Sequence, residues 1–320
     1  MRILITGAAG FVGGHLIQHL QTTTPDAELH GTTVTGYAGD QFPEVLFHEI
    51  DLRDSEHVTA LLDSLHPDQV YHLAAQAFVP RSFEAPWETL ENNVRSQLNL
   101  LLATIALRLT PRMLVVSSAE IYGPVSPDEL PIDESAPFRP TNPYSVSKVA
   151  QDMLAYQYHA SHDLPLIRVR PFNHFGPGQS ERFVAPAFAM QLARIEAGKQ
   201  EPVIKVGDLT ASRDFTDVRD IVRAYHLLMT RGTPGDVYNV ASGTVHSAQE
   251  ILDTLLQISG VNVEVEVDPE RLRPVEVPIN YGSPHHLQKQ TGWKPEIPFE
   301  QSLSDILEDC RQRIKNQQGA

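Results

Sequence analysis

The chain opens with a short apolar segment that runs directly into a glycine-rich turn. Residues 1–14 read MRILITGAAGFVGG, with a strand expected at Ile3–Thr6 and glycines at positions 7, 10 and 13. The apolar side chains that follow recur at helical spacing, at Val12, Leu16, Ile17 and Leu20. A strand that leads through glycines into a helix favours the first βα unit of a parallel sheet. Because glycines let the backbone approach a pyrophosphate at a helix N-terminus, the segment also predicts a dinucleotide-binding loop.

Strand and helix patterns alternate through the first half of the chain. Further strands are expected at Glu28–Val34, Val45–Glu49, Val70–Leu73, Met113–Ser117 and Leu166–Arg170. Helices are expected at Ser55–Leu65, Glu88–Leu109 and Pro143–His162. Repeated units of this kind predict an α/β fold with a doubly wound parallel Rossmann sheet, in which ligands bind at the carboxyl ends of the strands.

The composition of the sequence changes after Pro171. Glycine, proline and arginine become more frequent in the loops, and the expected helices and strands are shorter. We expect an NAD(P)-binding domain at 1–171, with returning segments at about 216–243 and 281–293 that include a strand at Val237–Val240. Residues 172–215, 244–280 and 294–320 are expected to form a smaller, interleaved α/β substrate lobe.

Bulk properties exclude several classes of partner. The 320 residues carry a formal net charge of −15, which argues against non-specific binding to nucleic acid or to an anionic membrane surface. No apolar run reaches the roughly 18 residues of a membrane span, and the N-terminal run belongs to the fold rather than to a signal peptide. The single cysteine, Cys310, cannot form an intramolecular disulfide, so a cytoplasmic protein is expected. The 14 histidines show no metal-binding spacing, and no metal is expected.

Tyr144 and Lys148 lie four residues apart in the helix expected at Pro143–His162, where Asn142 would cap the helix and place Tyr144 in its first turn. Residues at this spacing share a helix face, so the Lys148 ammonium can approach the Tyr144 hydroxyl. A nearby cation favours the phenolate and would lower the pKa of Tyr144. The pair could therefore exchange a proton near neutral pH, although the pattern alone also fits a helix with a polar face.

The preference between the two nicotinamide cofactors stays open in the sequence. An acidic residue after the second strand would bind a ribose hydroxyl, whereas an arginine there would bind the 2′-phosphate of NADP. The segment 30–34 reads HGTTV and offers neither. Asp51, after the third strand, could bond the adenine amino group or could cap the helix that begins near Ser55.

Ser118 follows the strand expected at Met113–Ser117 and could polarise a carbonyl group beside the Tyr144 phenol. At this point the chain resembles the extended short-chain dehydrogenases/reductases. The resemblance rests on Thr6–Gly13, Asp51-Leu52, the HLAA run at 72–75, Ser118 with Tyr122-Gly123, and Tyr144 with Lys148. In the second half RPFN at 170–173, RDFTDVRD at 213–220, RPVE at 273–276 and TGWKP at 291–295 resemble the nucleotide-sugar branch of that family, so the resemblance covers nearly the whole chain.

The segments 172–180, 182–184 and 204–209 further resemble the GDP-linked deoxysugar enzymes. That resemblance implies NAD(P)H-dependent reduction of the C4 keto group of GDP-4-keto-6-deoxy-D-mannose to GDP-D-rhamnose. Carried over by position, the catalytic residues would be Ser118, Tyr144, Lys148 and Glu120. The cofactor, NADP(H) or NAD(H), would be lined by Gly7, Gly10, Phe11, Val12, Gly13, Thr32, Asp51, Leu52, Leu73, Ala74, Ala75, Asn93, Tyr144, Lys148 and Pro171. The GDP-sugar would be held by Glu120, Asn173, Arg182, Val184, Lys205, Arg213, Arg273 and Glu276.

Other activities share the same catalytic residues. Glu120 could be the base of a GDP-mannose 4,6-dehydratase or of another nucleotide-sugar epimerase or dehydratase, because a dehydratase needs a base for the C5 proton. A serine at position 118 favours the reductase. A non-catalytic dinucleotide-binding protein is a further alternative, although such proteins typically lose the tyrosine or the lysine. The resemblance also implies a homodimer that pairs through the helices expected at Glu88–Leu109 and Pro143–His162.

Overall fold

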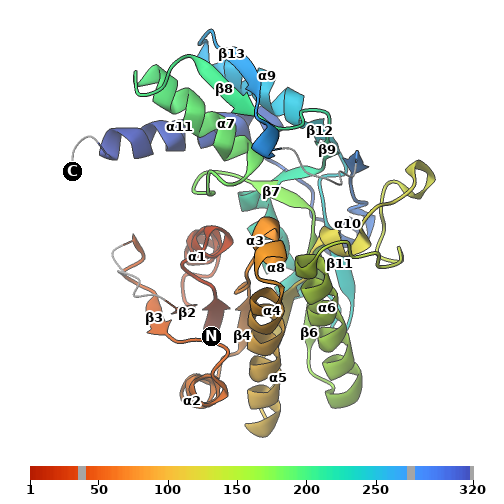
Figure 1. Cartoon of the computed structure of the whole chain (residues 1–320). Coiled ribbons are helices and arrows are strands. Elements are labelled where there is room, and N and C mark those ends of the chain that lie inside the picture. The colour runs from red at the N-terminus through yellow and green to blue at the C-terminus, as the bar shows by residue number, and fades with distance from the viewer. Residues whose placement is uncertain (35–40, 272–277, 318–320) are drawn as a thin grey trace.

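The computed structural model describes residues 1–34, 41–271 and 278–317. A seven-stranded, fully parallel sheet with the strand order β11-β6-β5-β4-β1-β2-β3 forms the lower part of Figure 1. Its strands are β1 (Arg2–Thr6), β2 (Glu28–Thr33), β3 (Leu46–Glu49), β4 (Gln69–His72), β5 (Arg112–Val116), β6 (Leu166–Pro171) and β11 (Val237–Val240). The predicted Rossmann sheet is confirmed, and every strand expected in the first half of the chain is present within one or two residues.

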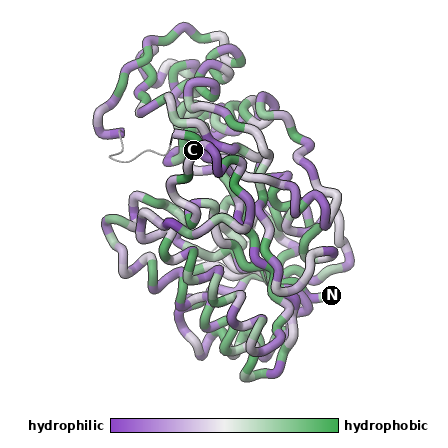
Figure 2. Tube along the Cα trace, turned by 90° about the vertical axis from the view of Figure 1, so that its right-hand side faces the viewer, coloured by the Kyte–Doolittle hydropathy of each residue, from purple (hydrophilic) through white to green (hydrophobic). Residues whose placement is uncertain are grey.

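Helices cover both faces of this sheet. One face packs against α1 (Phe11–Thr23) and α8 (Val218–Arg231), with the short α10 (His285–Thr291) beside β11. The other face packs against α2 (Ser55–Leu65), α5 (Ser96–Ala106) and α6 (Pro143–His162). In Figure 2 hydrophobic and hydrophilic residues alternate along the helical segments in the lower part of the molecule, as expected when one side of each helix faces a core. The predicted α2 and α6 match the observed bounds.

The single helix expected at Glu88–Leu109 is divided. The structure has α4 (Pro86–Leu90), a π-helical turn η2 (Glu91–Arg95) and then α5, with α3 (Val79–Glu84) just before them. Within the π turn the Asn93 side chain is fully buried and hydrogen-bonds Gln76 and Ser147. A π turn inserts one residue into the helix, which turns Asn93 towards these partners, and such turns are frequent at functional sites.

Smaller elements form the upper part of Figure 1. Helices α7 (Val184–Glu196), α9 (Ala248–Ser259) and α11 (Phe299–Asn316) pack around a second core that contains Phe188, Leu252 and Leu307. Three small sheets accompany them. These sheets contain β7 (Asn173–Phe175) with β10 (Phe215–Asp217), β8 (Val203–Val206) with β13 (Glu264–Val267), and β9 (Ser212–Arg213) between β12 (His246–Ser247) and β14 (Ile279–Asn280).

The remaining described elements are the short 3-10 helices η3 (Ala119–Tyr122), η4 (Pro127–Glu129) and η5 (Pro269–Arg271). The returning strand β11 and the helix α10 lie with the large sheet. The division into an NAD(P)-binding domain and a substrate lobe at the boundaries given above stays our proposal. Within the described ranges, no helix has the length and apolar character that a membrane crossing requires.

Candidate active site

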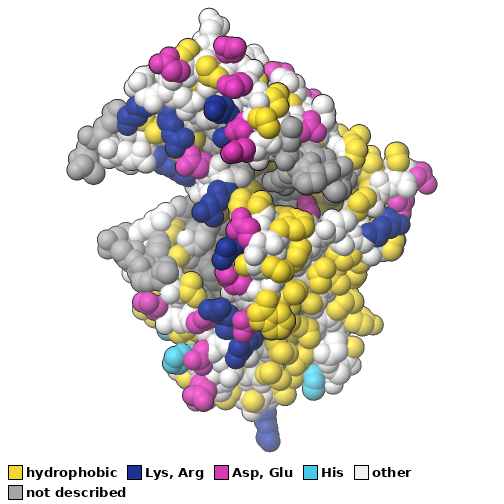
Figure 3. Space-filling view, in the orientation of Figure 1, with side chains coloured by type: hydrophobic (Ala, Val, Ile, Leu, Met, Phe, Trp, Pro, Cys, Tyr) yellow, Lys and Arg dark blue, Asp and Glu magenta, His cyan; other side chains and the backbone are white. Residues whose placement is uncertain are grey.

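A cavity of about 1170 Å³ lies where the carboxyl ends of the sheet strands meet the upper part of the molecule. Figure 3 shows the molecule hollowed between these two parts. The cavity is lined by most of the predicted site residues, namely Gly7, Gly10, Phe11, Val12, Gly13, Thr32, Leu73, Ala74, Ala75, Ser118, Glu120, Tyr144, Lys148, Pro171, Asn173, Arg182, Val184 and Arg213. Segments that are far apart in the chain therefore contribute to one space. Among the described residues, no three His, Cys, Asp or Glu side chains are grouped so that they could hold a metal ion.

The glycine loop is a tight turn at the N-terminus of α1. Gly7 adopts a left-handed φ of 67°, and the Gly10 N–H donates to the Gly7 carbonyl at 3.0 Å. A Cβ atom at Gly13 would lie only 2.5 Å from the carbonyl oxygens of both Gly7 and Ala8. Gly10 caps α1 without a side-chain hydrogen bond, so the first backbone N–H groups of the helix are not capped by a side chain. These backbone N–H groups at the start of α1 can donate hydrogen bonds to the pyrophosphate of a dinucleotide.

The Gly13→Ala variant is expected to lose nicotinamide-cofactor binding by at least about tenfold, because its methyl group must displace the turn that positions the N–H groups at the start of α1. The adjacent Gly14→Ala variant is the matched control. A Cβ atom at Gly14 would meet only the Phe42 ring at 3.6 Å, an ordinary contact. Titrating NADPH fluorescence against both variants measures the difference. Equal affinities in the two variants would contradict the assigned role of the loop.

Local sequence places the phenol of Tyr144. Asn142 caps α6 by accepting a hydrogen bond from the Ser145 N–H at 2.7 Å, and Pro143 occupies the first helical position. Tyr144 therefore lies in the first turn, as expected, and its ring is 8% exposed at the cavity wall. Ser118 caps the short helix η3 and forms a side-chain hydrogen bond with Tyr144. The serine and the phenol thus meet at one place in the cavity.

The electrostatics of this pair differ from the sequence expectation. Burial raises the pKa of Tyr144 to about 12; the hydrogen bond with Ser118 lowers it and the charge of Glu120 raises it. Burial also lowers the pKa of Lys148 to about 7, and its Nζ donates to the Val116 carbonyl at 2.9 Å. The expected lowering of the Tyr144 pKa by Lys148 is therefore wrong for the cofactor-free protein. Desolvation of the buried phenol dominates its pKa, and the phenol keeps its proton at neutral pH.

Glu120 follows Ser118 on η3 and lines the same cavity. Its Oε2 accepts a hydrogen bond from the Asn142 amide at 3.4 Å. A carboxylate therefore lies close to the first turn of α6, at the catalytic end of the cavity.

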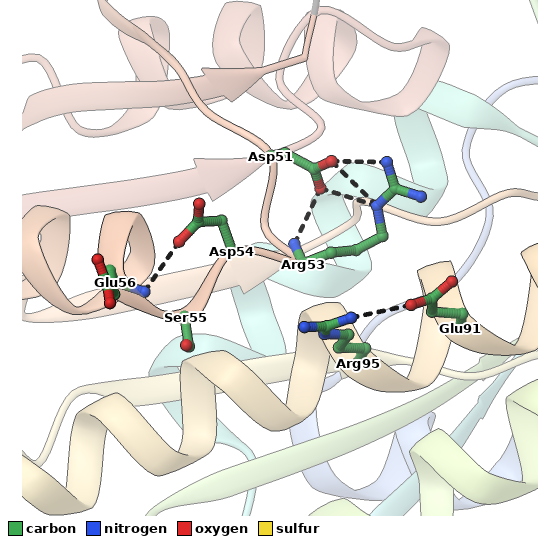
Figure 4. A pocket seen from close by; sticks show the side chains of 7 residues that line it. All are labelled: Asp51, Arg53, Asp54, Ser55, Glu56, Glu91 and Arg95. Carbon is green, nitrogen blue, oxygen red and sulfur yellow. Dashed lines mark hydrogen bonds and ion pairs between the residues drawn. The ribbon is translucent and has the colours of Figure 1, made fainter.

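Two of the predicted cofactor residues, Asp51 and Leu52, are not among the residues that line this cavity. Asp51 and Arg53 face one another in a shallow surface pocket, with the closest approach, Arg53 Nη2 to Asp51 Oδ2, at 2.6 Å (Figure 4). Hydrogen bonds from Arg53 hold the pKa of Asp51 below its usual range. The alternative that Asp51 caps α2 is wrong, because Asp54 accepts the N–H groups of Glu56 and His57. Leu52 is buried, and its carbonyl accepts from Asn99.

Two further predicted residues, Asn93 and Lys205, also lie outside the cavity lining. Asn93 is buried, and its side-chain amide hydrogen-bonds the backbone N–H and carbonyl of Gln76. It thereby fixes the loop after β4, which forms part of the cavity wall. Lys205 is exposed on β8, whose alternation turns its side chain away from the core formed by Ile204 and Val206. Arg273 and Glu276 lie outside the described residues.

Several cavity residues were not predicted. His174 lies parallel to the Phe11 ring at 6.2 Å, with burial lowering its pKa, and its Nδ1 contacts the Phe172 carbonyl at 3.2 Å. Tyr225 reaches the cavity from α8, and Arg271 and Asn280 reach it from the C-terminal part of the chain. Phe78 lies in the loop between β4 and α3. His174 and Phe78 could have been suspected because each follows a strand end, whereas Tyr225 carries no such signal.

The sequence of this chain is similar to those of known nucleotide-sugar enzymes. A family model described as GDP-mannose 4,6 dehydratase matches residues 4–306. The chain belongs to this family. A relative from Pseudomonas aeruginosa named GDP-6-deoxy-D-mannose reductase is 40% identical over 316 residues, which cover 99% of this chain and 99% of the relative. GDP-mannose 4,6 dehydratase 2 of Arabidopsis thaliana is 33% identical over 84% of this chain and 73% of the relative.

Solved structures of similar proteins have the same fold. The structure described as RMD from Pseudomonas aeruginosa complexed with NADPH is 37% identical, with a TM-score of 0.85 over 98% of this chain and 99% of that chain. A UDP-glucose 4-epimerase from Thermotoga maritima with UDP-glucose is 26% identical, with a TM-score of 0.89 over 98% and 100% of the two chains. The resemblance to extended short-chain dehydrogenases/reductases is thereby confirmed.

Proposed function

We propose that this chain is an NAD(P)H-dependent oxidoreductase that reduces the C4 keto group of GDP-4-keto-6-deoxy-D-mannose to GDP-D-rhamnose. The observation that carries the reaction type is the placement of the Tyr144 phenol beside Ser118 in the wall of the cavity that also contains the glycine loop. Reduction of a ketone needs a proton donor at this place, and the Tyr144 hydroxyl can supply the proton. The whole-length similarity to a GDP-6-deoxy-D-mannose reductase supports the substrate.

The residues have complementary roles in this proposal. The nicotinamide cofactor, NADP(H) or NAD(H), supplies the hydride that C4 receives. Tyr144 donates its proton to the C4 oxygen, and the Ser118 hydroxyl hydrogen-bonds the same oxygen as negative charge develops on it. Lys148 sits one helical turn below Tyr144, where its ammonium form stabilises the phenolate left after proton transfer.

Other residues that line the same cavity suit the nucleotide. Arg213, Arg182 and Asn173 line it, and guanidinium groups bind phosphate oxygens through strong, often bidentate, hydrogen bonds. These cations explain how an acidic chain could hold a diphosphate. Known structures of similar proteins are described with NADPH and with NAD, in keeping with either cofactor.

Dehydration of GDP-mannose is the second candidate, favoured by one observation. Glu120 places a carboxylate at the catalytic end of the cavity, where a C5 proton would be removed. Two incubations of the purified protein separate the candidates. Stoichiometric oxidation of NADPH with GDP-4-keto-6-deoxy-D-mannose is expected for the reductase. Formation of a keto sugar from GDP-mannose with catalytic NADP⁺, and no net NADPH use, would refute the reductase.

We also propose a homodimer that pairs through α3, α4, α5 and α6. Apolar side chains gather on this side of the molecule, on the lower right of Figure 3, and those exposed are Phe83, Trp87, Leu102, Val146, Met153 and Tyr156. Trp87 is 72% exposed, which is costly for so large an apolar ring unless a partner covers it. Light scattering should give twice the chain mass of 35.6 kDa for the wild type and the monomer mass for Trp87→Glu. A monomeric wild type would refute the dimer.

A cytoplasmic location completes the proposal. It is supported by Cys310, the sole cysteine, which is buried and in which burial raises the pKa of the thiol to about 12.

A further inference from the structure

An aromatic contact joins two loops that both line the cavity. Phe78 follows β4, and Phe183 immediately precedes α7; their rings lie edge to face with centroids 6.2 Å apart. The guanidinium of Arg182 lies over the Phe78 ring, 5.4 Å from its centroid. All three side chains line the cavity. Edge-to-face rings and a cation over a ring are favourable geometries, so the contact forms a defined wall.

The position of Phe78 is tied to the turn that carries Tyr144. The Ser147 hydroxyl donates to the Tyr144 carbonyl at 2.6 Å and accepts from Asn93 Nδ2 at 2.9 Å. Asn93 Oδ1 accepts from the Gln76 N–H at 2.7 Å. The Gln76 amide then holds both backbone groups of Phe78, accepting from its N–H at 2.6 Å and donating to its carbonyl at 3.2 Å. A continuous chain of hydrogen bonds therefore fixes the aromatic wall relative to the phenol.

The side chains around this wall offer an apolar surface. Ala77, Val79 and Pro80 continue it on the Phe78 side, and Val184 continues it beside Phe183. None of these four side chains can donate or accept a hydrogen bond. A hexose whose C4 oxygen contacts Tyr144 carries its C6 group on the neighbouring carbon, C5, so C6 lies within a few bond lengths of the phenol. A methyl group can be buried against such a wall without penalty, whereas a hydroxyl group would lose its water partners.

We propose that the Phe78–Phe183 wall receives the C6 group of the sugar and selects a 6-deoxy hexose over one with a C6 hydroxyl group. The inference rests on the proposed function for the identity of the nucleotide sugar. It adds the determinant that excludes GDP-mannose from a site whose catalytic residues could otherwise accept it. Apolar pockets reject an added hydroxyl group only moderately, so the selection is expected to be about 10- to 100-fold.

Binding calorimetry without nicotinamide cofactor tests the wall, because no turnover can then occur. GDP-D-rhamnose and GDP-D-mannose differ only at C6, and the wild type should bind the first at least about tenfold more tightly. Phe78→Asn supplies a polar partner and should reduce this preference to about twofold. Phe78→Leu is the matched apolar control and should retain the preference. Circular dichroism and the thermal unfolding midpoint show whether each variant is folded. The two sugars are compared within each protein, so any change in nucleotide binding through Arg182, which lies over the Phe78 ring, affects both equally.

Equal affinity of the wild type for the two sugars, or a full preference in Phe78→Asn, would overturn the proposal. If Phe78→Asn fails to fold, Phe183→Asn provides the same test from the opposite ring, which is 39% exposed and tolerant of a polar group. The proposed reaction is tested separately, by NADPH oxidation with the keto sugar. A wild type that prefers GDP-D-rhamnose but does not oxidise NADPH would refute the reductase activity and would still support selection by the Phe78–Phe183 wall.

Discussion

The Tyr144→Phe variant is expected to reduce the keto sugar about 100- to 10 000-fold more slowly than the wild type, the range that general acid catalysis contributes. The substitution keeps the buried ring and removes only the hydroxyl group that would protonate the C4 oxygen. The loss should therefore fall on kcat, while the affinity for NADPH changes little. The rate of decrease of NADPH absorbance at saturating substrate measures kcat.

Tyr158→Phe is the matched control for this experiment. Tyr158 lies on the same helix, α6, and is 8% exposed like Tyr144, but it packs in the core beneath α5 and α6 rather than at the cavity. It should retain nearly full activity. A Tyr144→Phe rate within about tenfold of the wild type would show that another group protonates the sugar.

The Asp152→Ala variant is expected to be less stable than the wild type by about 3 to 5 kcal/mol, the usual cost of removing one partner from a buried ionic cluster. Asp152 is fully buried on α6 and bonds two guanidinium groups of β6, those of Arg168 at 2.9 Å and Arg170 at 2.8 Å. Without the carboxylate both guanidinium groups stay buried without a counter-charge. The midpoint and slope of urea unfolding give the change in the free energy of unfolding.

Glu91→Ala is the comparison for the effect on stability. Glu91 pairs with Arg95 at 2.9 Å on the protein surface, one turn apart, and such pairs contribute no more than about 0.5 kcal/mol. If the two variants lose similar amounts of stability, the cluster around Asp152 does not anchor α6 to the sheet. Because α6 carries Tyr144 and Lys148, a loosened α6 should also lower kcat.

Much of the fold followed from short stretches of sequence. The bounds of α2, α6 and β11 were predicted to the residue, because caps and apolar periodicity act within one element. The division of Glu88–Leu109 was missed, since the π turn depends on Asn93 finding Gln76 and Ser147 elsewhere in the fold. Lys205 was assigned to the site from a motif, but strand alternation and the core under β8 turn it outward.

The candidate active site was likewise predictable from the sequence only in part. The glycine loop and the spacing of Tyr144 and Lys148 were legible in the sequence, because the residues of each pattern are neighbours along one turn or one helix. Only the tertiary structure decided that burial, rather than the Lys148 charge, governs the pKa of Tyr144. It also decided that Phe78 and Phe183, more than 100 residues apart, meet in one wall. Desolvation and contacts between distant segments depend on how the whole chain packs, which no local pattern records.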